Sequence, residues 1–264
     1  MKMAVVGKDV SKSLSPKMHT FLMKKLGAEC TYETVSVSPE AFEEKIEELL
    51  SSYDTLNVTI PFKRSVMPHL RAVEGDARAF GAVNTVKCRE RAGYNTDGEG
   101  FLLSLVTSGV QVKGKKALVL GTGGVGRSVI KKLADAGADV FAFDLNREAM
   151  SSVYEEFHCF TPLQEVKEEP YDLILNCTGI GMHKSEGKSP VGAQLLSLCE
   201  VAYDLIYEPK KSEFLRIAES LGKQIVNGVG MLFYQAYYAD CIFLGREVNA
   251  EEAKALFAAY TEEA

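Results

Sequence analysis

The chain has 264 residues, which is enough for two domains of ordinary size or for one large domain. Hydrophobic residues make up 46% of it and charged residues 25%, the balance of a globular protein, which excludes a disordered or fibrous chain. The net charge of −6 argues against a nucleic-acid-binding protein, because such proteins need basic surfaces to neutralise phosphates. We therefore expect a small-molecule ligand and no nucleic-acid partner.

The six cysteines and four histidines show neither a C-x-x-C pair nor an H-E-x-x-H motif. We therefore expect reduced thiols in a cytoplasmic protein, and we expect no metal site. The longest apolar stretch, residues 231–244, is interrupted by Gln235 and Asp240 and is too short to span a bilayer. The sequence accordingly predicts no membrane partner.

The first hundred residues alternate between strand-like and helix-like patterns, which is typical of an α/β domain. Ser15 and Pro16 predict a helix start with Ser15 as the cap, and Gly27 predicts the end of that helix. Ser38 and Pro39 predict a second helix with one apolar face. Further helical character is expected up to Phe80, and strands are expected at 3–7, 32–37, 56–60, 85–88 and 93–95, the last two as a hairpin.

A second unit is expected from about residue 100. Its helices are predicted at 101–106, from the glycine-rich segment 121–126 to 136, and at 146–157. Its buried strands are predicted at 116–120, 140–144, 173–177, 201–205 and 224–226. Strands alternating with helices predict a parallel sheet covered on both faces. Two more helices are expected at 231–245 and 251–260, with Asn249 and Glu252 forming a capping box for the last one.

Three glycines, Gly121, Gly123 and Gly126, form a G-x-G-x-x-G motif between a predicted strand and a predicted helix. In that context the first glycine permits the tight turn, the second lets the backbone approach a pyrophosphate, and the third lets helix and strand pack closely. The helix N-terminus then offers free N–H groups to phosphates. The alternative is a tight turn without a ligand, and the motif favours a dinucleotide cofactor.

Asp144 ends the next predicted strand, about 20 residues after the glycine motif, where a carboxylate can bind an adenosine ribose. A carboxylate there repels a 2′-phosphate, so Asp144 favours NAD over NADP. Arg147 follows in the next helical turn. It either softens this preference by binding phosphate or is an ordinary surface residue, and we favour the second interpretation.

Lys63 follows a predicted strand and Pro61, and Asp97 lies at the junction of the two predicted units. Brought together, an ammonium and a carboxylate could move a proton between a carbonyl and an alcohol. The alternative is an exposed Lys63 and a helix-capping Asp97, and spacing alone does not decide between them.

Several short polar side chains lie near predicted strand ends, where they offer hydrogen bonds to a polyhydroxylated acid. The alternative for Ser15 is a role only as a helix cap, and for Asn84 a role only in a turn. Gln235 lies in a helix that is apolar nearly all round, so its amide needs a partner, either a backbone carbonyl or a ligand hydroxyl. The set of candidates is Ser13, Ser15, Thr59, Asn84 and Gln235.

Eight motifs together resemble the shikimate dehydrogenase family, in the family's order and over almost the whole chain. They are Ser13–Pro16, Asn57–Lys63, Gly81–Thr85, Asn95–Gly98, Gly121–Gly124, Asn176–Thr178, Tyr203–Pro209 and Gly228–Met231 with Gln235. One departure concerns the cofactor: Asp144–Asn146 stands where NADP-type members carry Asn-Arg-Thr. The arginine that would bind a 2′-phosphate is thus absent, as in the NAD-using quinate/shikimate branch.

The resemblance implies an N-terminal α/β substrate domain, a Rossmann-type cofactor domain, and C-terminal helices that pack back on the first domain. The boundaries expected are 1–99 with 232–264 for the substrate domain, and 100–231 for the cofactor domain. Lys63 and Asp97 are implied to be the catalytic pair. The residues implied to bind substrate are Ser13, Ser15, Thr59, Asn84, Tyr207 and Gln235. Those implied to bind cofactor are Gly121, Gly123, Gly124, Val125, Gly126, Asp144, Thr178, Ile206, Gly228 and Met231.

We therefore expect hydride transfer between NAD or NADP and shikimate, giving 3-dehydroshikimate, by a monomer or a homodimer. Quinate is the alternative substrate, and Ser15, as against a bulkier threonine, favours shikimate. A non-catalytic sensor of the same metabolites is a second alternative, and the intact Lys63 and Asp97 argue against it. A plain dinucleotide-binding scaffold would leave the N-terminal polar clusters unexplained.

Overall fold

The computed structural model describes residues 1–263, except the side chain of His183, one of the four histidines considered above. The fold class is α/β, as predicted, with two six-stranded sheets. Two compact units divide the chain: Met1–Gly100 together with the segment from Phe233 onward, and Phe101–Leu232. Within residues 1–263, no helix is both long and apolar enough to cross a lipid bilayer.

The first unit is built on a mixed sheet with the strand order β2-β1-β3-β5-β6-β4. Strand β1 pairs in parallel with β2 and β3, whereas β5 is antiparallel to both β3 and β6. The strands are β1 Lys2–Gly7, β2 Thr31–Ser36, β3 Thr55–Val58, β4 Ala72–Val73, β5 Thr85–Lys87 and β6 Ala92–Tyr94. The helices of this unit are α1 Ser15–Lys25, α2 Phe42–Ser52, α3 Gly75–Phe80, α10 Ala250–Glu263 and most of α9 Val229–Leu244.

Alternation of side chains along β1 gives this sheet two covered faces, because successive residues of a strand point to opposite sides. Ala4 and Val6 belong to the buried cluster that includes the predicted apolar face of α2. Met3 belongs to another cluster, with Met23 of α1 and Phe243 of α9. The C-terminal helix α9 therefore packs on the first unit, as expected.

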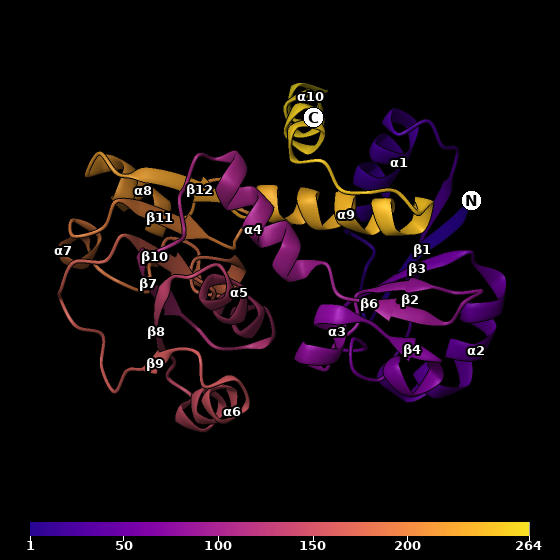
Figure 1. Cartoon of the computed structure of the whole chain (residues 1–264), viewed down its shortest axis with the longest axis horizontal. Helices are drawn as coiled ribbons and strands as arrows, with labels where there is room; N and C mark the ends of the chain where they lie inside the picture. Colours follow the sequence, from indigo (N-terminus) through magenta and orange to yellow (C-terminus); the bar gives the residue numbers. More distant parts are fainter. Residues whose placement is uncertain (264) are drawn as a thin grey trace. The chain divides into compact units, whose positions relative to one another are not determined.

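The second unit has six parallel strands in the order β12-β11-β10-β7-β8-β9 (Figure 1). The strands are β7 Lys116–Leu120, β8 Asp139–Phe143, β9 Thr161–Pro162, β10 Leu173–Asn176, β11 Val201–Asp204 and β12 Gln224–Asn227. The helices are most of α4 Asp97–Thr107, whose first turn belongs to the first unit, and α5 Gly124–Asp135, α6 Arg147–Phe157, α7 Ala193–Leu196 and α8 Glu213–Ser220. The chain order reverses between β7 and β10, which is the Rossmann-type arrangement predicted for this half.

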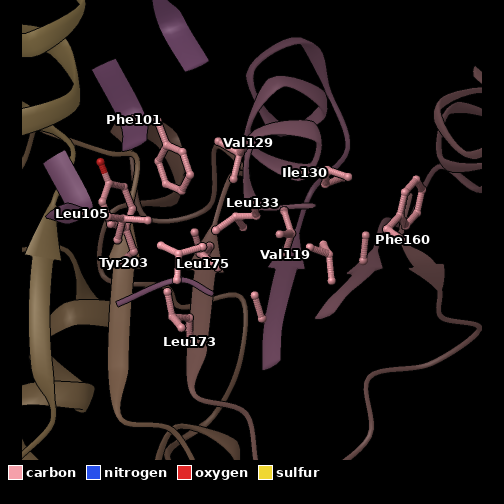
Figure 2. Close-up of a cluster of buried hydrophobic side chains, with 14 of the residues drawn as sticks. Phe101, Leu105, Val119, Val129, Ile130, Leu133, Phe160, Leu173, Leu175 and Tyr203 are labelled. Carbon is pink, nitrogen blue, oxygen red and sulfur yellow. The ribbon is translucent and has the colours of Figure 1, made fainter. Parts of the chain in front are cut away.

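Strand alternation again explains how both faces of this sheet are covered. Val119 of β7 and Leu175 of β10 lie in one cluster with residues of α4, α5 and α6, including Phe101 and Leu133 (Figure 2). Leu118 of β7, Ile174 of β10 and Ala202 of β11 face the other way, in a cluster with residues of α7 and α8. The near-continuous apolar strands of the sequence thus reflect a sheet buried on both sides.

Some local predictions were wrong. Ser15 is the first residue of α1 rather than its cap, and the Ser13 hydroxyl accepts a hydrogen bond from the Ser15 N–H at 3.2 Å. The segment before Phe80 contains the short strand β4 as well as α3. Asn249 does cap α10 through the N–H of Glu252, but the Glu252 carboxylate turns to Tyr237 and Arg246 instead of completing the capping box.

Candidate active site

Lys63 and Asp97 meet in the first unit. The turn after β3 closes with a hydrogen bond from Phe62 N–H to Thr59 C=O, and the buried Phe62 ring anchors it directly before Lys63. Asp97 begins α4, which follows β6. Lys63 Nζ lies 2.6 Å from Asp97 Oδ2, and the two side chains are 22% and 14% exposed. This is a charge-assisted hydrogen bond that a substrate can still reach.

Asn84 holds the other oxygen of Asp97. Its Nδ2 donates to Asp97 Oδ1 at 2.9 Å and to Thr96 Oγ1 at 3.1 Å, while its Oδ1 accepts from the Thr96 N–H at 3.0 Å. The Thr85 hydroxyl also donates to Asn84 Oδ1. Asn84 is therefore more than a turn residue, because its buried amide fixes the carboxylate at the start of α4.

Gln235 joins the same cluster from helix α9. The Thr96 hydroxyl donates to Gln235 Oε1 at 3.3 Å, so the amide oxygen has a side-chain partner. Gly100 permits this approach of α4 to α9, because a Cβ at that position would lie 2.5 Å from the backbone nitrogen of Gln235. The two helices thus bring Gln235 to the residues around Asp97.

The hydroxyls of Ser13, Ser15 and Thr59 belong to the segments that follow β1 and β3, which are parallel neighbours, and all three residues are half-buried. Because the carboxyl ends of parallel strands meet at one edge, these groups share that edge with Lys63. Tyr207 lies in the second unit, after β11, and its contact with substrate stays a prediction.

Some polar residues of this region, among them Thr96, Asn57 and Tyr32, were not among the predicted site residues. Thr96 links Asn84 to Gln235, Asn57 is buried in β3, and the Tyr32 hydroxyl of β2 donates to Asn57 Oδ1 at 2.8 Å. Asn57 had a signal in the sequence, since it interrupts an apolar strand between Leu56 and Val58. Tyr32 had none, because tyrosine is common in any strand.

The glycine loop follows β7, at the point where the strand order reverses, and leads into α5. Gly121 has φ +98°, a conformation that favours glycine, and a Cβ on Gly126 would lie 2.2 Å from the Gly121 carbonyl oxygen. Gly123 and Gly124 are exposed, and a Cβ added at either would meet no atom within 4 Å. The loop therefore leaves the N-terminus of α5 open, with Val125 in its first turn, as a pyrophosphate site requires, and its binding of a cofactor stays a prediction.

Asp144 lies directly after β8 and beside this loop. Its Oδ2 accepts hydrogen bonds from the N–H of Thr122 at 2.6 Å and from the Thr122 hydroxyl at 3.0 Å, and its Oδ1 accepts from the N–H of Asn146 at 2.8 Å. Burial raises the pKa of Asp144, but these hydrogen bonds outweigh it and hold the pKa below its usual value. The carboxylate is therefore ionised at the edge of the loop.

Neither Leu145 nor Arg147 supplies a positively charged group beside Asp144 that is free to bind a 2′-phosphate. Leu145 is 81% exposed and apolar. The Arg147 guanidinium donates to the carbonyl oxygens of Leu163 and Gln164 and stacks over the Phe143 ring, 4.7 Å from its centroid. The Arg147 guanidinium is thus held by residues of its own unit, and Arg147 is partly buried rather than the ordinary surface residue that the sequence favoured.

The remaining cofactor candidates follow the strands beside β7. Thr178 comes after β10, Ile206 after β11, and Gly228 with Met231 after β12. A Cβ on Gly228 would lie 2.0 Å from the Leu205 carbonyl oxygen, so only glycine fits this close approach. All four lie at the carboxyl edge of the parallel sheet, where open α/β sheets bind their ligands. No group of side chains suited to a metal ion is found among the described residues.

Two family models match successive parts of this chain. Residues 5–86 match the family model of the shikimate dehydrogenase substrate binding domain, and residues 91–185 match that of the D-isomer specific 2-hydroxyacid dehydrogenase NAD binding domain. A shikimate dehydrogenase (NADP(+)) from Thermus thermophilus is 36% identical over 248 residues, covering 93% of each chain. One from Carboxydothermus hydrogenoformans is also 36% identical, covering 89% of this chain and 88% of its own.

Solved structures show the same likeness. The shikimate 5-dehydrogenase of Thermus thermophilus, in complex with NADP(H) and shikimate, superposes with a TM-score of 0.88 at 33% identity, covering 98% of this chain and 99% of its own. That of Listeria monocytogenes, in complex with shikimate and NAD, has a TM-score of 0.84 at 25% identity, covering 97% and 96%. With a relative this similar over nearly its whole length, the chain belongs to the shikimate dehydrogenase family.

Proposed function

We propose that this protein is a shikimate dehydrogenase, which reversibly reduces 3-dehydroshikimate to shikimate with a nicotinamide dinucleotide. The observation that carries the proposal is the ion pair of Lys63 and Asp97, set among hydroxyl and amide groups. Similarity of the chain to shikimate dehydrogenases over 93% of its length supports the substrate.

Lys63 and Asp97 have the chemistry that this reaction needs. A bound nicotinamide cofactor supplies the hydride to C3 of 3-dehydroshikimate. The Lys63 ammonium donates a proton to the C3 oxygen as that oxygen becomes an alcohol, and the steps reverse in the direction of oxidation. Asp97 holds the ammonium at 2.6 Å and can accept a hydrogen bond from a substrate hydroxyl.

The remaining polar residues are assigned by the chemistry of their side chains. Ser13 and Ser15 donate to the substrate carboxylate, with Tyr207 as a further donor. Thr59, Asn84 and Gln235 bind the ring hydroxyls. These assignments are supported by the family's motifs and by the shared edge of β1 and β3 on which the serines and Thr59 lie.

In the second unit, we assign the cofactor to the glycine loop at the carboxyl edge of the sheet. NAD is the preferred cofactor in this proposal, since the ionised Asp144 repels a 2′-phosphate and Leu145 offers no cation to bind one. Curated relatives named for NADP(+) are the reason to test this preference rather than to assume it.

The proposal extends to a cytoplasmic enzyme that works as a monomer or a homodimer. All six cysteines are free, as is usual in reducing compartments. Light scattering of the purified protein over a range of concentrations gives the mass of the particle and so distinguishes the two states.

The test is an assay of the purified protein with shikimate and with quinate, each with NAD and with NADP. We expect the absorbance of the reduced cofactor to rise fastest with shikimate and NAD. Activity on quinate but not on shikimate would show that quinate is the substrate instead. A large advantage of NADP over NAD would refute the cofactor preference. Binding of shikimate without any turnover would favour the metabolite sensor instead.

A further inference from the structure

Polar residues end three neighbouring strands of the second unit and form a row across its sheet. Asn176 is the last residue of β10, Asp204 of β11 and Asn227 of β12. The register pairs Asn176 with Asp204 and Asp204 with Asn227, so the three lie side by side. Asn176 and Asp204 are fully buried, and Asn227 is half-buried. Burying such groups is costly unless each has partners, and the proposed reaction gives none of the three a role.

Asn176 holds the segment that follows β10. Its Oδ1 accepts hydrogen bonds from the Thr178 N–H at 3.1 Å and from the Thr178 hydroxyl at 2.6 Å. Its Nδ2 donates to the Ile180 carbonyl oxygen and to Asp204 Oδ1, both at 3.1 Å. Because the Thr178 hydroxyl gives its single proton to Asn176, it can only accept a hydrogen bond from a ligand.

Asp204 and Asn227 hold the segment that follows β11. Asp204 Oδ1 accepts from the Ile206 N–H at 3.0 Å, and its Oδ2 accepts from the Ser212 hydroxyl. Asn227 Nδ2 donates to the carbonyl oxygen of Ile206 at 3.2 Å and to that of Lys210 at 2.6 Å. Ile206 is therefore held at its N–H by one member of the row and at its carbonyl oxygen by another.

Asn227 also holds the segment that follows β12. Its Oδ1 accepts from the N–H of Val229, the first residue of α9, at 2.7 Å. Met231 lies two residues further along this helix, and the N–H of Gly228 donates to the Ile206 carbonyl oxygen at 3.3 Å. All three segments that carry the candidates for the nicotinamide end of the cofactor are thus tied to the same row.

We propose that Asn176, Asp204 and Asn227 are positioning residues for the nicotinamide end of the cofactor. They act through the segments that carry Thr178, Ile206 and Met231, which they hold in one conformation before the cofactor arrives. Preorganisation of this kind lowers the entropy cost of binding. The inference rests on the proposed function, since it needs these segments to bind a nicotinamide dinucleotide.

The test begins with Asn176→Ala, which removes the amide that holds Thr178. We expect KM for NAD to rise about fivefold, the effect of one neutral hydrogen bond, while KM for shikimate stays within about twofold of wild type. Loss of stability alone would lower kcat through the folded fraction and leave KM for NAD unchanged. A KM for NAD equal to that of wild type would overturn the proposal.

Inhibition by AMP distinguishes the two ends of the cofactor. AMP carries only the adenosine half of NAD, so its Ki in competition with NAD reports on the glycine loop and Asp144. We expect Asn176→Ala to leave this Ki within about twofold of wild type. A Ki that rises as much as KM for NAD would show that the variant disturbs the whole cofactor site, and it would overturn the assignment to the nicotinamide end.

Asn227→Ala is the second variant, at the half-buried member of the row. The same pattern is expected, with a raised KM for NAD and an unchanged Ki for AMP, because Ile206 and the start of α9 lose a partner. Where Asn176→Ala fails to fold, Asn227→Ala decides the proposal, and an unchanged KM for NAD would overturn it.

Ser104→Ala is the matched control. The Ser104 hydroxyl is buried in the same unit and lies 2.6 Å from the Tyr203 hydroxyl, so this variant also loses a buried hydrogen bond. Its KM for NAD is expected to equal that of wild type. A rise like that of Asn176→Ala would show that any such loss in this unit has the effect, and it would refute a specific role for the row.

The wild-type rate with shikimate is measured first. Absence of turnover with both NAD and NADP would refute the proposed function and this inference with it. Normal turnover with an unchanged KM for NAD in the variants of the row would overturn the inference alone.

Discussion

Lys63 Nζ lies 2.6 Å from Asp97 Oδ2, although the two residues are 34 positions apart in the chain. Lys63 is placed by the turn after β3, and Asp97 by the start of α4. Neither the turn nor the helix alone brings the two side chains together, so the pair exists only in the folded first unit. Its two partly exposed side chains are the centre of the proposed chemistry.

Replacing the ammonium should slow turnover steeply without unfolding the protein. In Lys63→Ala we expect kcat to fall by about 10²–10⁴-fold, the usual contribution of a general acid. The melting temperature should change little, because a partly exposed ion pair contributes little to stability. Lys87→Ala, a lysine of β5 in the same unit, is the control and should keep wild-type kcat. Near-normal turnover by Lys63→Ala would remove Lys63 from the mechanism.

Asp97→Asn separates charge from shape at the same site. The amide can still accept a hydrogen bond from Asn84, but it no longer attracts the Lys63 ammonium. We expect kcat to fall about 10- to 100-fold, the value of one hydrogen bond to a charged group. Steady-state kinetics with shikimate measures this, and an unchanged kcat would contradict a role for the carboxylate.

Leu145→Arg should change the cofactor preference, because it places a cation beside Asp144 where a 2′-phosphate would lie. We expect kcat/KM for NADP to rise about tenfold relative to that for NAD. Leu221→Arg, at another partly exposed leucine of the same unit, should leave the ratio unchanged. The account of Asp144 and Leu145 fails if Leu145→Arg does not move the ratio.

Asp204 predicts a pH dependence of stability. Burial raises the pKa of this carboxyl above its usual value of 3.8, against hydrogen bonds from Ser212, Ile206 and Asn176 that lower it. The folded state therefore binds the proton more tightly, and the stabilising contribution present at low pH is lost as pH rises through the folded pKa. Because asparagine does not titrate, the melting temperature of Asp204→Asn minus that of wild type should increase from acidic to neutral pH.

Asp172 provides a control of opposite sign. A hydrogen bond from Lys115 holds the pKa of Asp172 below its usual value, so its contribution is present at neutral pH and lost on acidification. The melting-temperature difference for Asp172→Asn should therefore decrease from acidic to neutral pH. Thermal scans of both variants and of wild type from acidic to neutral pH measure these differences. If the two melting-temperature differences change in the same direction with pH, the assignment for Asp204 is contradicted.

Much of the fold could be predicted from the sequence, because the signals were local. The strand Lys116–Leu120, the helix after the glycine loop and the hairpin of β5 and β6 each carry their own periodicity or turn residues. The expected meeting of Lys63 and Asp97 is observed. Their chemical roles, and those of the other site residues, stay predictions.

What the sequence did not reveal depends on contacts between distant segments. The short strands β4 and β9 have two residues each, too few to show a period. The sequence predicted Ser15 as a helix cap, but its N–H donates a hydrogen bond to the Ser13 hydroxyl. The reason is that the chain turns before the helix begins. The buried ion pair of His19 and Asp240 joins residues 221 positions apart; Asp240 interrupts an apolar stretch, but no local pattern marks His19 as its partner.

The central claim is hydride transfer to C3 of a shikimate-type substrate, and isotopic labelling tests it most directly. The purified protein is mixed with 3-dehydroshikimate and NADH that carries deuterium at the transferable position, and the product is examined by NMR. The account predicts shikimate with deuterium at C3, formed about 10²–10⁴-fold more slowly with Lys63→Ala. Unlabelled or absent shikimate, under conditions where a known shikimate dehydrogenase forms the labelled product, would contradict it.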